Sequence, residues 1–199
     1  MASPRRKPTA TSDEVREALM QAALDAFVEH GFHGTSMRDI ARRAGTAVSH
    51  SYYYFASKGE LLRTLMVRVT ADLLHALDHA ATPADPVDRL AALVRAHVLF
   101  HTERQAESFV GNSELRSLAP DERTAIVALR DRVSDHFKTA IDDGIQQGRF
   151  AAARRDEAVL AVATMCTAVA GWYRADGNRT PHEIADAYAA LILNMLRPE

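Results

Sequence analysis

The sequence predicts an all-α fold, with an N-terminal helix-turn-helix domain of three helices followed by a C-terminal helical bundle. Three observations support this prediction. Apolar residues recur at spacings of three and four along most of the chain, which is the period of amphipathic helices. No stretch alternates apolar and polar residues as a half-buried strand does. Capping residues, prolines and glycines stand where the helical patterns begin and end.

The first predicted helix begins at a capping box formed by Thr11 and Glu14 and ends at Gly31. Its apolar residues form one stripe, so we expect it to pack across the next two helices and to hold them rigid. Residues 1–10 precede this helix and contain two prolines and the basic run Arg5–Lys7. This composition predicts a disordered basic arm.

The next two helices are short and meet at Gly45, within residues 35–54. Thr35 is the expected N-cap of the first of them, and its apolar residues Met37, Ile40, Ala41 and Ala44 share one face. Gly45 stands where a helix end favours a left-handed residue, and a second helix follows from about residue 47 to 55. This is the layout of a helix-turn-helix, whose second helix enters the major groove of DNA.

The residues of this region also resemble a known family. The matching motifs are Thr-Ser-Met-Arg-Asp-Ile-Ala (35–41), Ala-Gly (44–45), Tyr-Tyr-Tyr-Phe (52–55) and Ser-Lys-Gly-Glu-Leu-Leu (57–62). Together they resemble the DNA-binding signature of TetR-family regulators, and the chain length also suits that family. The departures are Thr46 and Ala47 in place of Val-Ser, Ser49 in place of a smaller residue, Ser51 in place of Leu and Tyr54 in place of His. These departures lie largely in the second helix, so the resemblance implies the fold but not which operator is read.

The resemblance implies that this region contacts DNA. Base edges are expected to meet Val48, Ser49, His50 and Tyr53, and Arg38 is expected to reach a base or the backbone. Phosphates are expected to meet Tyr52, Tyr54 and Lys58. Thr35 and Ser36 are also expected to bind DNA. Because successive helix residues turn by about 100°, the aromatic run cannot all face one way. Phe55 is expected to turn into the core, and Tyr52 and Tyr53 to stay at least partly exposed. The basic arm is either a solvated tail or a further contact to phosphate or the minor groove.

The rest of the chain predicts helices only. A second capping box, Ser57 with Glu60, opens a long helix that ends near Ala80, and residues 82–86 form a loop. Lys58 lies in the first turn of this helix, where a cation is unfavourable unless a phosphate is beside it. Five further helices are expected. One begins at Asp85-Pro86, a short one covers Phe109 to Leu118, and a third runs from Pro120 to Gly148. The fourth extends from a cap at Asp156 to about Arg174, and the last runs from the cap at Thr180, with Pro181 and Glu183, to about Leu196.

The last two predicted helices carry more apolar residues than is expected of helices on the surface of a monomer. Small residues at Ala161, Ala168 and Gly171 would let another helix approach closely. The family resemblance implies a homodimer in which these two helices of each subunit form a four-helix bundle. A dimer also agrees with a helix-turn-helix that reads two half-sites about a twofold axis.

The resemblance further implies a ligand cavity within the bundle between Leu61 and Gly171. An apolar wall with a few polar points is typical of small-molecule sites, although the same residues would also suit a closed core. The run Gly-Trp-Tyr-Arg (171–174) and the later Thr-Pro-His-Glu-Ile-Ala (180–185) resemble part of some lipid- and acyl-CoA-responsive members. The residues expected to line the cavity are His97, Phe100, His101, Phe109, Leu118, Phe137, Met165, Trp172 and Tyr173.

Two His-x-x-x-His pairs, His75/His79 and His97/His101, each place two imidazoles on one helix face. Such pairs are expected by chance in a chain with 9 histidines, so no metal site is predicted. His97 and His101 are expected to be polar points in or beside the cavity, and the other pair to be solvated.

Composition and motifs exclude several classes of protein. The formal net charge is −2, so positive charge is local to the helix-turn-helix and the arm rather than general. Cys166 is the single cysteine, which excludes an intrachain disulfide and indicates a reducing cytoplasm. The N-terminus lacks an apolar signal segment, and the longest apolar stretch, 158–173, is too interrupted to cross a membrane. No phosphate-binding loop or nucleophile–base motif appears, so neither an enzyme nor a cofactor is predicted.

The combined prediction is a cytoplasmic, homodimeric transcriptional repressor that leaves a double-stranded DNA operator when a small apolar effector binds, an acyl-CoA or lipid-like molecule being one candidate. Its expected parts are the arm at 1–10, a DNA-binding domain at 11–56, and a ligand-binding and dimerisation domain at 57–199. Two alternatives stay open. One is an activator or a regulator without a ligand. The other, motivated by Thr46, Ser49 and Ser51, is a helical ligand- or metal-binding module that has lost specific DNA reading.

Overall fold

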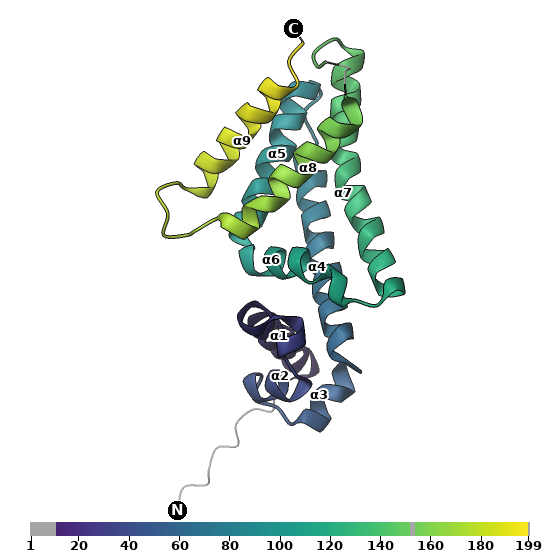
Figure 1. Ribbon diagram of the computed structural model, residues 1–199, viewed down its shortest axis with the longest axis vertical. Coiled ribbons are helices and arrows are strands. Elements are labelled where there is room, and N and C mark those ends of the chain that lie inside the picture. The colour runs from purple at the N-terminus through teal and green to yellow at the C-terminus, as the bar shows by residue number, and fades with distance from the viewer. Residues whose placement is uncertain (1–10, 152–153, 199) are drawn as a thin grey trace, which may run out of the picture. The chain divides into compact units, whose positions relative to one another are not determined.

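The computed structural model describes residues 11–151 and 154–198, and the chain divides into two compact units, Met1–Leu62 and Arg63–Glu199. Within the described residues the regular structure consists of nine α-helices and one short 3-10 helix, with no strand (Figure 1). The all-α prediction is therefore confirmed. The disordered arm predicted at 1–10 lies outside the described residues.

The first unit contains α1 (Ser12–Gly34), α2 (Met37–Arg43), α3 (Val48–Tyr54) and the first turn of α4 (Lys58–Ala80). The predicted capping box is present, because the Thr11 hydroxyl accepts the Glu14 N–H and the Glu14 carboxylate accepts the Thr11 N–H. Gly31 has φ 69° and interrupts α1 near its end, in agreement with the predicted stop. Phe55 is buried as expected, and it shares the core of this unit with Leu19, Ala23, Phe27, Ile40, Ala41, Leu61 and Leu62.

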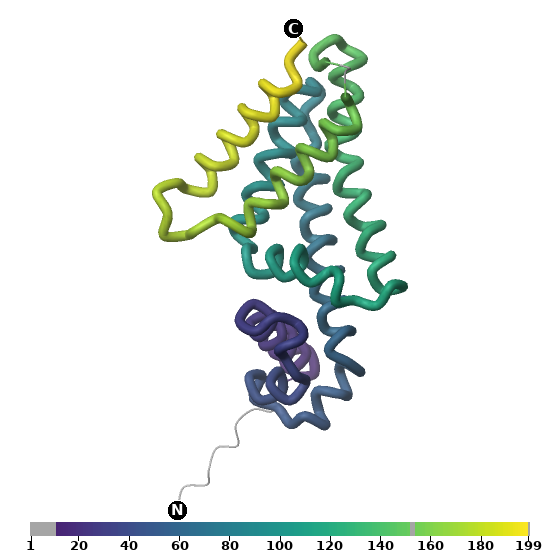
Figure 2. Tube along the Cα trace, in the orientation of Figure 1, coloured from purple at the N-terminus to yellow at the C-terminus, as the bar shows by residue number. Residues whose placement is uncertain are grey.

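The second unit contains the rest of α4, α5 (Pro86–Glu103), α6 (Gln105–Ser113), the 3-10 helix η1 (Leu115–Ser117), α7 (Pro120–Gln146), α8 (Arg155–Trp172) and α9 (Pro181–Met195). Helix α5 is central, since it packs against α7, α8 and α9. The Cα trace shows α8 and α9 running in opposite directions and joined by a short loop (Figure 2).

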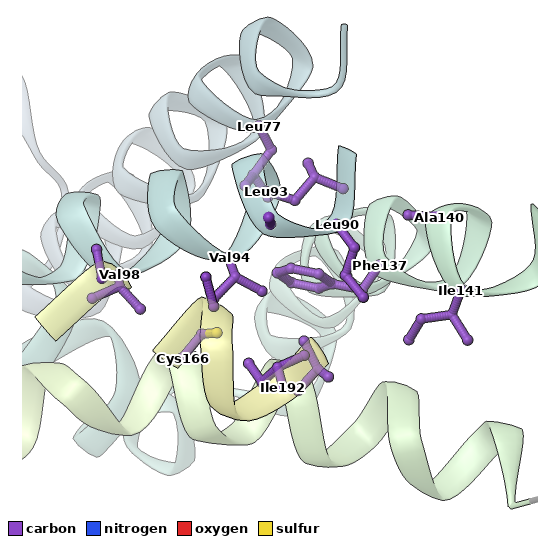
Figure 3. Close-up of a cluster of buried hydrophobic side chains, with 14 of the residues drawn as sticks. Leu77, Leu90, Leu93, Val94, Val98, Phe137, Ala140, Ile141, Cys166 and Ile192 are labelled. Carbon is purple, nitrogen blue, oxygen red and sulfur yellow. The ribbon is translucent and has the colours of Figure 1, made fainter. Parts of the chain in front are cut away.

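The core of the second unit is one apolar cluster to which α4, α5, α7, α8 and α9 contribute. Leu77, Leu90, Phe137, Cys166 and Ile192 are all fully buried in it (Figure 3). Burying each large apolar side chain of this kind contributes roughly 1.5–3 kcal/mol. The cluster therefore provides most of the favourable free energy that holds these five helices together.

Several helix ends agree with the prediction. Asp85 caps α5 by accepting the N–H groups of Val87 and Asp88, with Pro86 at the first helical position. The Thr180 capping box with Glu183 and Pro181 opens α9. Sequence patterns of this kind fix a helix end because each satisfies backbone groups that no helical partner can reach.

Other ends differ from the prediction, each by a few residues. The N-cap of α2 is Ser36 rather than Thr35, because the Ser36 hydroxyl accepts the Asp39 N–H. Ser57 caps α4, but the Glu60 carboxylate accepts the N–H of Ala56 instead of that of Ser57.

Two more differences lie in the second unit. The short segment predicted from Phe109 begins earlier, at Gln105, where α6 follows α5 almost directly. The cap predicted at Asp156 is wrong, because α8 starts at Arg155 after Arg154 takes a left-handed conformation with φ 59°. Asp156 lies in the first turn instead, where its carboxylate pairs with the Arg155 side chain.

Candidate nucleic-acid interface and ligand cavity

Helices α2 and α3 are joined by a tight turn at Gly45. Gly45 has φ 68°, a conformation that favours glycine, and its N–H donates to the carbonyl of Arg42 at 3.2 Å. The N–H of Thr46 donates to the carbonyl of Ala41 at 3.0 Å, which closes the end of α2. The chain therefore reverses within three residues and presents α3 as a separate short helix, as the helix-turn-helix layout predicts.

The side chains of α3 divide into an inner and an outer face. Ser51 is fully buried, and its hydroxyl donates to the carbonyl of Val48 at 2.7 Å. Tyr53 is 80% exposed and Tyr52 is 51% exposed, as expected. Ser49 and His50 are also exposed. The departure at Ser51 therefore affects the core of the helix-turn-helix rather than the surface that could meet DNA.

His50 is held among neighbouring polar and aromatic side chains. Its Nδ1 lies 3.1 Å from the Thr46 hydroxyl, and its ring stacks near Tyr53 and meets the edge of Tyr54. The contact to Thr46 leaves Nε2 as the ring nitrogen available to an outside partner. Thr46, which looked like a departure from the family pattern, thus orients the histidine.

The structure places Thr35 differently from the expected DNA contact. Its side chain is 4% exposed, and its hydroxyl donates to the carbonyls of Ala26 at 3.1 Å and Gly31 at 2.9 Å. Thr35 therefore secures the end of α1 inside the unit. The prediction that the Thr35 side chain contacts DNA is therefore wrong, because the side chain is buried. Ser36 and Arg38 beside it are exposed.

Lys58 also has an internal role that the sequence did not indicate. Its ammonium group donates to the carbonyls of Phe32 and Thr35, the latter at 2.6 Å, and lies 4.1 Å from the centre of the Phe32 ring. These carbonyls stand where α1 ends, so the cation complements a helix C-terminus. A phosphate is therefore not needed to explain a lysine in the first turn of α4.

The positive charge of α2 is partly balanced. Arg42 pairs with Asp39 at 2.8 Å, and Arg43 pairs with Glu29 of α1 through two hydrogen bonds. The Arg43 guanidinium lowers the pKa of the Glu29 carboxyl by donating these hydrogen bonds. The local basic patch is consequently weaker than the count of arginines implies.

The second unit contains a cavity of about 630 Å³ that is partly open to solvent, which we call the bundle cavity. Its volume is within the range of small-molecule sites. Helices α4, α5, α6, α7 and α8 all contribute to its wall. The lining residues are Val69, Thr70, Leu73, His97, Phe100, His101, Ser108, Phe109, Gly111, Asn112, Ser113, Arg130, Val133, Ser134, Leu160, Ala163, Thr164, Thr167, Ala168 and Gly171.

Four of the residues expected to line the cavity do so: His97, Phe100, His101 and Phe109. The other five do not. Phe137 lies one layer behind, with its ring stacked on His97 at 5.5 Å. Leu118 is buried elsewhere, and Met165 and Tyr173 pack against the core cluster. Trp172 is 47% exposed and stacks near Tyr188.

His97 and His101 are stacked in the wall, with ring centres 4.4 Å apart. His101 Nδ1 donates to the carbonyl of His97 at 2.9 Å, so its Nε2 is the acceptor. Burial, with a smaller contribution from His101, lowers the pKa of His97 well below its usual value, and burial lowers that of His101 to about 4. Both imidazoles are therefore neutral at neutral pH. No cluster of three or more metal-ligating side chains occurs in the part of the chain that the structure describes.

Sequence reasoning missed Arg130, which contributes a guanidinium to the cavity wall from α7. Burial lowers its pKa, but an arginine remains charged in proteins. A signal was present in the sequence, because Arg130 lies four residues after Ile126 and three before Val133, both of which are buried. An arginine on the apolar stripe of a helix indicates either a buried ion pair or a binding site.

The last two helices carry exposed large apolar side chains. Leu160 and Trp172 of α8 and Leu191 and Met195 of α9 are between 47% and 68% exposed. Exposed apolar patches are typical of protein–protein interfaces, so these helices are candidates for one.

Two family models match the sequence. The model described as "Bacterial regulatory proteins, tetR family" matches residues 19–65, which include α2, α3 and the turn at Gly45. The model described as "Tetracyclin repressor-like, C-terminal domain" matches residues 83–196, more than half of the chain. The chain belongs to the TetR family.

Individual TetR-family proteins are similar over nearly the full length. The transcriptional repressor KstR2 of Mycobacterium tuberculosis is 30% identical over 190 residues, which are 92% of this chain and 94% of KstR2. A TetR-family regulatory protein from Rhodococcus RHA1 superimposes with a TM-score of 0.89 at 27% identity, covering 96% of this chain and all of that one. AibR in complex with isovaleryl coenzyme A and operator DNA has a TM-score of 0.81 at 24% identity, covering 92% and 98%. The likeness to AibR concerns the fold.

As a TetR-family protein, the chain is a DNA-binding transcriptional regulator and not an enzyme. Burial raises the pKa of the Cys166 thiol to about 12, which leaves this thiol unreactive. Across residues 11–151 and 154–198, no helix combines the length and the apolar character that crossing a bilayer requires.

Proposed function

We propose that this TetR-family regulator is a homodimeric, cytoplasmic repressor that leaves its operator when a small, largely apolar ligand enters the bundle cavity. In this proposal residues 11–56 read DNA, and residues 57–199 bind the ligand and form the dimer. The observation that carries it is the outer face of α3, where exposed polar and aromatic side chains follow a tight glycine turn. The repressor sign is supported by KstR2, which is named a repressor.

The proposed base-reading residues are those exposed along α3 and at the start of α2. His50 presents Nε2 to a base edge, Ser49 offers a hydroxyl, and Tyr53 is the most exposed aromatic side chain of the helix. Arg38 and Ser36 contact a base or the backbone, Val48 packs on a thymine methyl group, and Tyr52 and Tyr54 contact phosphates. Lys58 supports DNA binding by holding the end of α1 in place.

The proposed dimer forms through the exposed apolar face of α8 and α9. Leu160, Leu191 and Met195 would be buried by the same face of a second copy, as a twofold interface requires. A dimer presents two copies of α3, which can enter successive major grooves about 34 Å apart. One copy alone would make too few contacts for tight, selective binding.

The proposed release mechanism is a shift in population. A ligand that packs better in one arrangement of the bundle favours that arrangement. Helix α4 is the proposed link, because it contributes its first residues to one unit and its lining residues Val69, Thr70 and Leu73 to the other. To weaken operator binding roughly a hundredfold, the ligand must prefer one state by about 2.7 kcal/mol. Acyl thioesters of coenzyme A are one candidate class, since AibR was crystallised with such a molecule.

The test is binding of the purified protein to the DNA upstream of its own gene, at two salt concentrations, with scrambled DNA as the control. Tight binding that falls steeply with salt and is selective for sequence is the expected result. Candidate acyl thioesters are then titrated into the complex, and release of DNA is measured. Equal, weak binding to both DNAs would favour the alternative of a ligand-binding module, and increased transcription on binding would favour an activator.

A further inference from the structure

Arg130 is the charged side chain in the wall of the bundle cavity. Arg89, Arg104 and Arg155 of the same unit each pair with an aspartate carboxylate. Arg130 has no carboxylate within ion-pair distance among residues 11–151 and 154–198, although it is partly buried. Desolvating a charge without a counter-ion is costly, and this cost is normally offset by an opposite charge or by hydrogen bonds.

Within the described residues the Arg130 side chain makes one hydrogen bond, which uses only one of its guanidinium N–H donors. One guanidinium nitrogen, Nη2, donates to the carbonyl of Gly111 at 2.7 Å, near the end of α6. This bond is a helix C-terminal cap, which is a common structural use of arginine. A guanidinium has five N–H donors, however, so most of its capacity is left for a group in the cavity that both residues line.

Other polar atoms in the same wall also lack partners within the described structure. The hydroxyl of Ser108 and the Nδ1 of His97 are buried without a hydrogen bond, and each of these side chains is at least nine-tenths buried. Both residues line the bundle cavity. Buried polar groups are normally satisfied, so such atoms indicate a missing partner.

The rest of the wall is suited to hydrocarbon. Its large apolar lining residues are Val69, Leu73, Phe100, Phe109, Val133 and Leu160. His97 and His101 are neutral at neutral pH because their pKa values are lowered. They therefore carry no positive charge that could attract an anion in place of Arg130. The cavity therefore combines the guanidinium of Arg130 with a largely apolar wall.

We infer that the bundle cavity selects an amphiphile with one anionic head group, a carboxylate or a phosphate, and that Arg130 pairs with this group while the apolar wall holds the hydrocarbon. This inference rests on the proposed ligand-binding role of the cavity. A charge-assisted, two-point hydrogen bond to a guanidinium would also satisfy the remaining donors of Arg130. Ser108 is the neighbouring donor that can add a hydrogen bond to the same oxygen atoms.

The test is calorimetric titration of the full chain, without DNA, with a length series of straight-chain carboxylates, the alkyl phosphates and the alkanols of equal length. The wild type is expected to bind one anionic series roughly tenfold to a hundredfold more tightly than the alkanols. The better of the two anionic series identifies the head group. Arg130→Gln is expected to abolish this preference by weakening anion binding far more than alkanol binding, and Arg130→Lys to retain part of it.

Arg123→Gln is the matched control. Arg123 lies on the same helix and donates to the carbonyl of Leu118 at 3.1 Å, but it does not line the cavity. It should keep the preference for the anion. Thermal melting of each variant establishes that it is folded.

Binding of neither anionic series, equal binding of anion and alkanol by the wild type, or an unchanged preference in folded Arg130→Gln would overturn the inference. Because DNA is absent from these titrations, such a result would leave operator binding untouched. Failure of operator binding, conversely, would overturn the proposed repressor without changing the titrations.

Discussion

The ammonium group of Lys58, in the first turn of α4, lies 2.6 Å from the carbonyl oxygen of Thr35, at the end of α1. The same nitrogen also donates to the carbonyl of Phe32. One side chain therefore joins the last helix of the first unit to the turn that precedes α2. The contact fixes the start of α4 against the end of α1.

Lys58→Met should destabilise the first unit by about 1–3 kcal/mol, because it retains the alkyl chain but removes the ammonium donor from the Thr35 carbonyl and leaves the Phe32 carbonyl with only the Thr35 N–H. Denaturant unfolding measures this loss. DNA binding should weaken alike for every sequence, since the substitution disturbs the whole reading unit. Lys138→Met, at an exposed position of α7, should change stability by less than about 0.5 kcal/mol. Equal stability of Lys58→Met and the wild type would contradict the internal role of Lys58.

His50→Ala should change which DNA sequences are preferred rather than uniformly weaken binding. His50 is exposed and is oriented by Thr46, so it is placed to discriminate between base edges. Selection from a randomised operator library gives the preference directly. Tyr52→Ala, which removes a proposed phosphate contact, should lower affinity with an unchanged preference. The assignment of His50 to base reading fails if both variants give the same selected sequence as the wild type.

Stability should fall as the pH is lowered from about 6.5, because of the buried histidines. In the unfolded chain an imidazole takes up a proton near pH 6.5, whereas His101 in the folded protein does so only near pH 4. Between these values the unfolded state binds more protons, so each pH unit removes up to about 1.4 kcal/mol for each such group. Urea unfolding between about pH 7 and pH 5 measures the slope.

In the same experiment, His101→Gln should reduce the slope, whereas His182→Gln, at an exposed position of α9, should not. A steeper or unchanged slope in His101→Gln would show that the loss arises elsewhere.

Gly144→Ala should destabilise the protein even though alanine favours helices. A Cβ atom at this position of α7 would overlap the ring of Phe150, which is 4% exposed and packs over the glycine. The gain of about 1 kcal/mol in helix propensity is outweighed by overpacking, so a net loss of about 1–3 kcal/mol is expected. Combining Gly144→Ala with Phe150→Leu should cost less than the sum of the two single changes. Strict additivity in a double-mutant cycle would rule out the overlap.

Leu191→Arg should convert the proposed dimer to monomers and thereby weaken operator binding. Leu191 is 56% exposed on α9, and an unpaired charge there would be buried in the interface at a cost of several kcal/mol. Sedimentation velocity measures the mass in solution. Val127→Arg, at an apolar position of α7 that is also exposed, should remain a dimer. If Leu191→Arg sediments as the wild type does, the interface does not lie on this face.

The fold could be predicted from the sequence because its helix ends carry local signals. Gly45, the pair Asp85-Pro86 and the Thr180 capping box each act through the backbone groups next to them, so a single stretch of sequence suffices. The N-cap of α2 differs from the prediction by one residue because Thr35 and Ser36 both offer a hydroxyl. Only the interior of the first unit decides that Thr35 turns inward and Ser36 caps the helix.

The cavity could be predicted only in part, for a different physical reason. Periodicity shows which side of a helix is buried, but it does not show whether neighbouring helices meet there or leave a space. Periodicity places both Phe100 and Phe137 on the buried side of their helices. Phe100 nevertheless lines the cavity, whereas Phe137 lies behind His97. Periodicity places Arg130 on the apolar side of α7, but it does not show that a cavity lies there.

Cys166 has a practical consequence. Its thiol is fully buried and its pKa is raised to about 12, so reagents that attack thiolates will not modify it in the folded protein. A cysteine introduced at an exposed position, as in Tyr53→Cys, would therefore accept a spin label or fluorophore selectively, without any need to remove the native cysteine. A dimer would then carry one probe on each α3, and the separation of the two probes could be followed with and without ligand in an otherwise native sequence.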